Sequence, residues 1–146
     1  MKKLRIEADR ADLGDFIDRG VLLHGHTGPF LIAGIRAGLL GLKLLDHPGY
    51  FGIRAESETG GEPPVSCFSD GIQIGSGCTI GKGNLRVIDS GIPRVRFTTD
   101  DGRRVSIELR GEVLRMFREG EIEAESERAR SLPLTELFAW TGPSSD

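Results

Sequence analysis

The chain has 146 residues, of which 28% are charged and 38% hydrophobic, and its formal net charge is −3. This length and composition indicate one globular domain that can bury its own core. The negative charge argues against nucleic-acid binding, which requires a basic surface, and the two cysteines exclude a disulfide framework. No apolar run is long enough to predict a membrane span. The charged start of the chain does not resemble a signal peptide, so we expect a cytoplasmic protein.

Two helices are predicted in the first third of the chain. Residues 8–23 carry apolar side chains at helical spacing. A second helix begins at Pro29, a residue suited to a first helical turn, and continues to about residue 46. It is apolar nearly all round, so we expect it to be the central buried helix. Three glycines on one side would let another element pack closely: Gly34, Gly38 and Gly41.

The middle of the chain predicts a mostly antiparallel sheet. Residues 51–58 alternate apolar and polar side chains, as a half-buried strand does, and residues 85–88 resemble a second strand. Two further alternating runs, 95–97 and 105–109, flank Asp100-Asp101-Gly102 and predict a hairpin.

The remaining segments predict short helices at residues 66–74, 111–117 and 135–140. Residues 119–130 are dense in charge, which predicts a solvated helix or a mobile link. The fold class is therefore α+β, with a mostly antiparallel sheet packed against a central apolar helix and flanking helices. We expect a single domain over residues 1–146, with its core at about 8–118 and a charged link and closing helix at about 119–146.

His24 and His26 are the first candidates for chemistry. Imidazole is a common ligand of zinc-like ions, and a His-x-His pair can present two rings to one ion. By itself the pair is equally typical of a helix cap. The only two cysteines, Cys67 and Cys78, also lie beside polar or glycine-rich turns. A buried cysteine is often only a small hydrophobic residue, but two nitrogen and two sulfur donors together suit zinc, or alternatively nickel or iron.

The glycine-rich segment of residues 75–84 predicts a loop that comes close to a ligand. Lys82 and Asn84 would hold a carboxylate or phosphate group of a substrate, with the loop backbone at Thr79 and Gly81 beside it. The segment is not a Walker A loop, since Ser76 and Gly83 depart from that motif.

Asp70 lies one helical turn before Gln73. It would either orient a ligand imidazole or a substrate, or cap its helix. With Asp70 and Lys82, Cys78 completes the candidate catalytic set if the metal site keeps a position open.

The hairpin's polar face carries a group of arginines: Arg94, Arg96, Arg103 and Arg104. This group is interpreted as a solvated strand face balanced by neighbouring acids, or as a strip that binds a partner.

Four motifs in order resemble the FmdE family, which is named after a subunit of tungsten or molybdenum formylmethanofuran dehydrogenase. They are His24-Gly25-His26, the helix with Gly34-Ile35-Arg36-Ala37-Gly38, the segment Cys67-x-x-Asp70-x-Ile72-Gln73, and Gly77-Cys78-Thr79-Ile80-Gly81-Lys82-Gly83-Asn84-Leu85.

The resemblance implies an α+β domain with a metal pocket, whose ligands would be His24, His26, Cys67 and Cys78, and it implies a homodimer. Gly28 stands where the family commonly has cysteine, and no cysteine follows Cys78, so we expect the family's zinc ribbon to be absent. The implied function is a metal-dependent, oxidoreductase-associated protein with a small-molecule substrate. The alternatives are a metal carrier or sensor, an accessory subunit of a molybdopterin or tungstopterin assembly, and a purely structural interaction protein.

Overall fold

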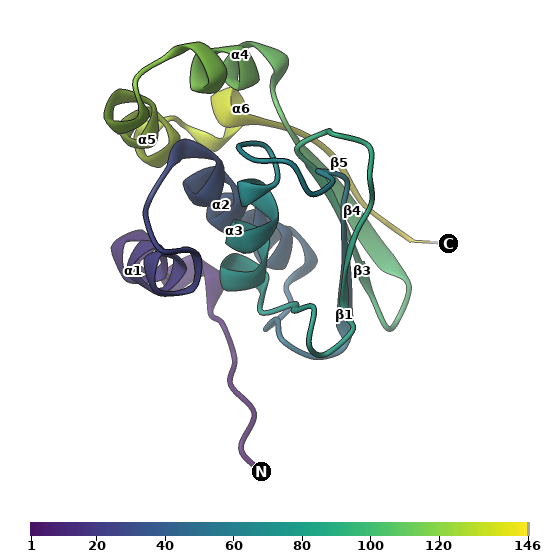
Figure 1. Ribbon diagram of the computed structural model, residues 1–146. Helices are drawn as coiled ribbons and strands as arrows, with labels where there is room; N and C mark the ends of the chain where they lie inside the picture. Colours follow the sequence, from purple (N-terminus) through teal and green to yellow (C-terminus); the bar gives the residue numbers. More distant parts are fainter. Residues whose placement is uncertain (146) are drawn as a thin grey trace.

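A five-stranded sheet with helices packed on one face forms the fold (Figure 1). The structure is a computed structural model and describes residues 1–145. The strand order is β2-β1-β3-β4-β5, with β1 and β2 parallel and every other neighbouring pair antiparallel. The prediction of an α+β fold with a mostly antiparallel sheet is therefore confirmed. The strands are β1 (Ile53–Ser57), β2 (Leu85–Val87), β3 (Arg94–Thr99), β4 (Arg103–Leu109) and β5 (Phe138–Ser145).

The helices lie between the sheet and solvent, and α2 is the central one (Figure 1). Thirteen of its residues are buried, which confirms the expectation from its apolar sequence. No helix within residues 1–145 has the length and hydropathy to cross a membrane. The helices are η1 (Ala8–Arg10, a 3-10 turn), α1 (Leu13–His24), α2 (Pro29–Leu45), α3 (Cys67–Ser76), α4 (Gly111–Glu119), α5 (Ile122–Ser131) and α6 (Leu134–Leu137).

Helices α2 and α3 pack with almost no side chain between them. A Cβ added to Gly34 would lie 2.1 Å from the carbonyl oxygen of Phe68, and one added to Gly75 would lie 2.2 Å from that of Ile35. Gly38 faces the backbone of Gly75 in the same way. The glycines therefore serve close packing within the chain, as the sequence predicted, and they fix α3, which carries Cys67 and Asp70, against α2.

Three segments differ from the sequence predictions. The predicted helix at 8–23 is broken, because the backbone at Ala11 and Asp12 is extended and the Asp12 side chain accepts a hydrogen bond from the Gly14 N–H, which starts α1 at Leu13. The charged segment at 119–130 is not a mobile link: α5 packs on α2 and buries Ala129 completely.

The predicted closing helix at 135–140 is mostly wrong. Only Leu134–Leu137 is helical, and the chain continues as β5, which pairs with β4 so that Phe138 lies opposite Leu109. Pairing with an open strand edge outweighs the weak helical preference of this short segment. The glycines of α2 and the buried Phe138 thus face the interior of this chain, so they do not argue for the homodimer, which stays a prediction.

Candidate functional site

A cavity of about 170 Å³ opens where the end of α1, the start of α2 and the start of α3 meet. We call it the histidine cavity. It brings together three of the four predicted metal ligands, His24, His26 and Cys67, from positions far apart in the sequence. Its other lining residues are Gly28, Pro29, Phe30, Leu31, Pro64, Phe117, Gly120 and Ile122.

His24 is the last residue of α1 and is held by α3. Its Nδ1 lies 2.6 Å from Oδ2 of Asp70, and the Gln73 side-chain amide donates to the other carboxylate oxygen at 3.3 Å. A carboxylate only accepts, so Nδ1 of His24 carries the proton, and Nε2 of the neutral ring keeps its lone pair. This is the outer contact that typically orients a metal-binding imidazole. The predicted role of Asp70 in orienting an imidazole thus has a direct contact behind it.

His26 is prepared in the same way by the backbone. Its Nδ1 lies 2.7 Å from the carbonyl oxygen of Thr27, which can only accept, so its Nε2 also keeps a lone pair in the neutral ring. The two rings are 4.9 Å apart between centroids and tilted by 50°. Between them Gly25 has a φ of +96° and ends α1. A left-handed residue is needed for the sharp turn that places both imidazoles at one cavity, and glycine adopts this conformation without strain.

Cys67 begins α3 and is half-buried. Burial, and then the nearby charge of Asp70, raise the pKa of its thiol, so in the absence of an ion it is a thiol and not a thiolate at neutral pH. A bound cation would reverse this balance, because a coordinating thiol is deprotonated. Cys67 is therefore a ligand that becomes available together with the ion.

The opposite wall of the histidine cavity is apolar. Phe30 from α2 and Phe117 from α4 meet edge to face, with centroids 5.4 Å apart and planes at 84°. Ile122, the first residue of α5, is half exposed beside them. Sequence reasoning missed these contributions from α4 and α5, although the spacing of Val113 and Phe117 is that of one helical face.

Arg36 holds this wall in place. From the middle of α2 its Nη1 donates to the carbonyl oxygens of Ala129 at 2.9 Å and Leu132 at 2.6 Å, at the end of α5. Burial lowers the pKa of the Arg36 guanidinium. A charged residue within an apolar helix was the sequence signal for such a contact.

The donors of the histidine cavity fit a metal ion in chemical type but are not yet in a coordination geometry. Two neutral imidazoles and a thiol suit zinc and similar ions. Nevertheless, within residues 1–145 no three His, Cys, Asp or Glu side chains are arranged closely enough to hold a metal ion. The cavity thus presents a preoriented histidine pair, with Cys67 in the wall beside it.

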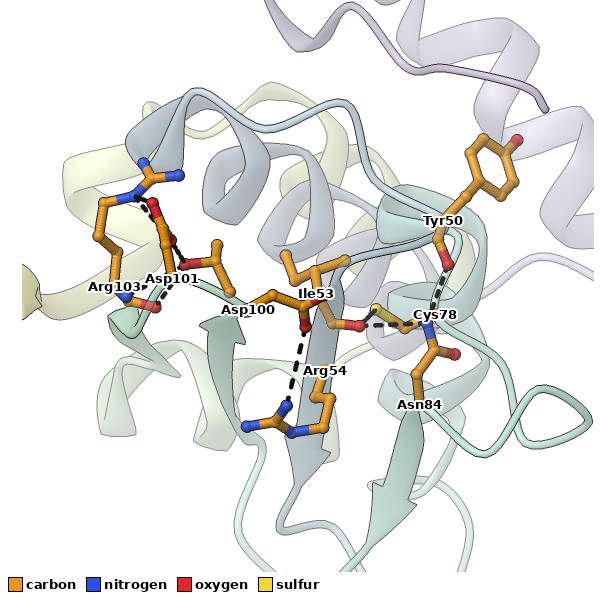
Figure 2. A network of polar contacts seen from close by, with 9 residues as sticks. Tyr50, Ile53, Arg54, Cys78, Asn84, Asp100, Asp101 and Arg103 are labelled. Atoms are coloured by element: carbon orange, nitrogen blue, oxygen red, sulfur yellow. Dashed lines mark hydrogen bonds and ion pairs between the residues drawn. The ribbon is translucent and has the colours of Figure 1, made fainter.

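The structure does not bring Cys78 to the histidine cavity. It is fully buried in the hydrophobic core, where its backbone N–H donates to Ser76 Oγ at 3.1 Å and its thiol lies 3.8 Å from the carbonyl oxygen of Ile53 (Figure 2). Burial raises the pKa of this thiol. These are the properties of a packed hydrophobic cysteine.

The predicted substrate-binding residues of the glycine-rich loop brace the loop itself. Lys82 Nζ donates to the carbonyl oxygen of Gly77 at 2.7 Å and to Thr79 Oγ1 at 2.9 Å. Asn84 Oδ1 accepts from the Thr79 N–H at 2.9 Å, and Asn84 Nδ2 donates to the carbonyl oxygens of Tyr50 and Ile53 (Figure 2).

Gly81 lies at the loop tip, with open space where a Cβ would be. Thr79, Gly81, Lys82 and Asn84 are all absent from the lining of the histidine cavity. Their polar groups explain the loop's conformation, which the sequence alone could not distinguish from a ligand site.

Comparison with known proteins agrees with this arrangement. The family model described as "FmdE, Molybdenum formylmethanofuran dehydrogenase operon" matches residues 23–142, a range that contains every residue of the histidine cavity. The chain belongs to the FmdE family. The resemblance seen in the sequence motifs is therefore confirmed.

Two similar proteins illustrate the family's range. A "Probable S-adenosyl-L-methionine-binding protein" of Archaeoglobus fulgidus is 26% identical over 136 residues, which are 82% of this chain and 36% of that relative. The chain thus spans about a third of that relative's length. A crystal structure of an FmdE-like protein of tungsten formylmethanofuran dehydrogenase type, from Syntrophus aciditrophicus, matches with a TM-score of 0.64 and 19% identity, over 95% of this chain and 76% of that one. At this identity the match shows a shared fold.

Proposed function

We propose that this FmdE-family protein binds a late divalent metal ion, preferably zinc, in the histidine cavity. The ligands are Nε2 of His24, Nε2 of His26 and the thiolate of Cys67, and Cys78 is not among them. The observation that carries the proposal is that both histidines spend Nδ1 on an acceptor, a carboxylate or a carbonyl. Both rings thus offer Nε2 as the free donor.

Three protein ligands leave room for a small molecule beside the ion. Zinc sites with three protein ligands keep a position for water or substrate, whereas structural sites use four. In such a site zinc polarises a carbonyl or lowers the pKa of a bound water. The protein's own residues would orient and shield the reactants: Asp70 fixes the ring of His24, and Phe30, Phe117 and Ile122 exclude water from one side.

The size of the cavity limits what accompanies the ion. Sites for drug-sized ligands usually have about 300–1,000 Å³, whereas the histidine cavity has about 170 Å³. The cavity suits an ion with a ligand of a few heavy atoms, and it would hold only one end of a molecule as large as the S-adenosyl-L-methionine in the relative's name. A carrier or sensor, or an accessory subunit of a pterin enzyme assembly, would use the same ion without turnover. The open position and the apolar wall favour a site that also takes a small molecule.

Zinc affinity measured by competition with a chromophoric chelator tests the proposal. His24→Gln and His26→Gln should each weaken zinc binding by about 100-fold or more, because each removes a direct ligand. Asp70→Asn should weaken it about 10- to 100-fold, as expected for the loss of a contact behind a ligand. His47→Gln is the matched control, because His47 is the remaining histidine and does not line the cavity. Equal zinc affinity in the wild type, His24→Gln and His26→Gln would contradict the proposal.

A further inference from the structure

The outer face of the sheet is basic although the chain as a whole is acidic. All helices described lie on the other face (Figure 1). Alternate residues of β1 to β4 point outward, and arginine outnumbers glutamate among them. The outward arginines are Arg54, Arg86, Arg94, Arg96 and Arg104, and the outward acids are Glu56 and Glu108. The sequence analysis singled out part of this group on the hairpin, and the histidine cavity does not explain it.

A hollow of about 440 Å³, here called the sheet hollow, lies on this face across β1, β3, β4 and β5. Its polar side chains come from two adjacent rows of cross-strand neighbours. The first row is Glu56, Arg96, Ser106 and Thr141, and the second is Thr98, Arg104 and Ser144. The register between β4 and β5 shifts between these two rows. Such irregularities commonly re-aim side chains beside binding sites.

Arg96, inside the sheet hollow, is less well matched by acids than Arg94 at its border. Arg94 donates to both carboxylate oxygens of Glu58 and to Glu108. Arg96 has its nearest carboxylate at 3.6 Å, and this is the same Glu58 that Arg94 already binds. Each guanidinium has five N–H donors, so Arg96 keeps donors for a ligand.

The hydroxyl groups around the two arginines specify the chemistry further. Thr98, Ser106, Thr141 and Ser144 supply O–H donors next to the guanidinium groups of the two rows. Guanidinium forks and hydroxyl donors together suit a phosphate group, which accepts through several oxygens at once. Among the residues that line the sheet hollow, no side chain is aromatic, so a nucleobase would find no ring on which to stack. Glu56 at the edge can accept from hydroxyl groups of the ligand.

We propose that the sheet hollow binds a small phosphorylated polyhydroxy molecule, such as a sugar phosphate. Arg96 and Arg104 hold the phosphate, the threonine and serine hydroxyls orient it, and Glu56 accepts from the hydroxylated part. The hollow's volume lies within the range of small-molecule sites. The site is separate from the histidine cavity, since the two share no lining residue.

Titration with glucose 6-phosphate, followed by amide NMR shifts, tests this assignment. The amides of Thr98, Ser106 and Thr141 should shift saturably with a dissociation constant below about 1 mM. Glucose, and sodium chloride at matched ionic strength, should not reproduce these shifts. Arg96→Gln and Arg104→Gln should each weaken binding about 10-fold, because each removes a charge-assisted contact.

Arg10→Gln is the matched control, because it makes the same change of charge at an exposed residue outside the sheet. It should leave the affinity within about twofold. The assignment is overturned if the shifts do not saturate by about 10 mM, or if Arg96→Gln, Arg104→Gln and Arg10→Gln bind equally. Glutamine at these exposed strand positions leaves the core intact, and an unchanged melting temperature confirms folding of each variant.

Discussion

Replacing Gly34 with alanine should force α2 and α3 apart. The new Cβ would lie 2.1 Å from the carbonyl oxygen of Phe68 and 2.9 Å from Cα of Gly71, whereas non-bonded carbon contacts are most favourable at about 3.5–4.0 Å. Both neighbours are backbone atoms, so no rotamer change relieves the overlap and the helices must move by about 1 Å or more. Overpacking of this kind costs about 3 kcal/mol or more, and the higher helix propensity of alanine returns about 1 kcal/mol. We expect a net loss of about 2 kcal/mol or more.

Urea unfolding followed by circular dichroism measures this loss. Gly14→Ala is the matched control, because Gly14 is also helical but an added Cβ would meet its nearest neighbours at an ordinary 3.5 Å. It should be neutral or stabilise by up to about 1 kcal/mol. If Gly34→Ala were as stable as Gly14→Ala, the close backbone packing of α2 on α3 would be wrong. The position of Asp70 relative to His24 would then be in doubt too, because Asp70 lies on α3.

Three other properties can be tested independently. Arg36→Met leaves carbonyl groups at the end of α5 without their charged donor, so it should cost about 1.5–3 kcal/mol and speed amide exchange across residues 122–131; unchanged exchange would refute this. The hydrogen bond from Arg94 lowers the pKa of Glu58, so this pair stabilises the fold above the ordinary glutamate pKa of about 4.3 and the stabilisation is lost as pH falls below it. The unfolding free energy of the wild type should thus decline more steeply on acidification than that of Glu58→Gln, and parallel profiles would contradict the argument. Because burial raises the pKa of both thiols, a thiol reagent at neutral pH should modify Cys67 slowly and Cys78 only on unfolding, and equal rates in the native state would count against their different burial.

The fold was predictable where one periodicity dominates a long segment. The apolar helix α2 and the hairpin of β3 and β4 follow from their sequence patterns alone. Residues 138–145 were not predictable, since their strand depends on the open edge of β4, a partner that their own sequence does not reveal. The break before α1 depends on one local hydrogen bond from Gly14 to Asp12, which is weaker than the periodic signal around it.

The candidate site was predictable in its residue types but only partly in its geometry. The turn at Gly25 places His24 and His26 together because the two histidines are local neighbours. Whether Cys67 or Cys78 joins them depends on how α3 packs on α2, which is set by glycine contacts between distant segments. Sequence spacing gives both cysteines the same appearance, and only the packing separates the one in the cavity wall from the one in the core.

The central claim is that the ion in the histidine cavity is bound by two imidazoles and the thiolate of Cys67. Cobalt(II) titration of the metal-free protein tests this most directly, because a thiolate bound to cobalt gives a charge-transfer absorption band that imidazole ligands do not give. The account predicts one equivalent of cobalt, with a thiolate band that is lost in Cys67→Ser and kept in Cys78→Ser. A band that survives in Cys67→Ser and disappears in Cys78→Ser, or no stoichiometric cobalt binding, would contradict it.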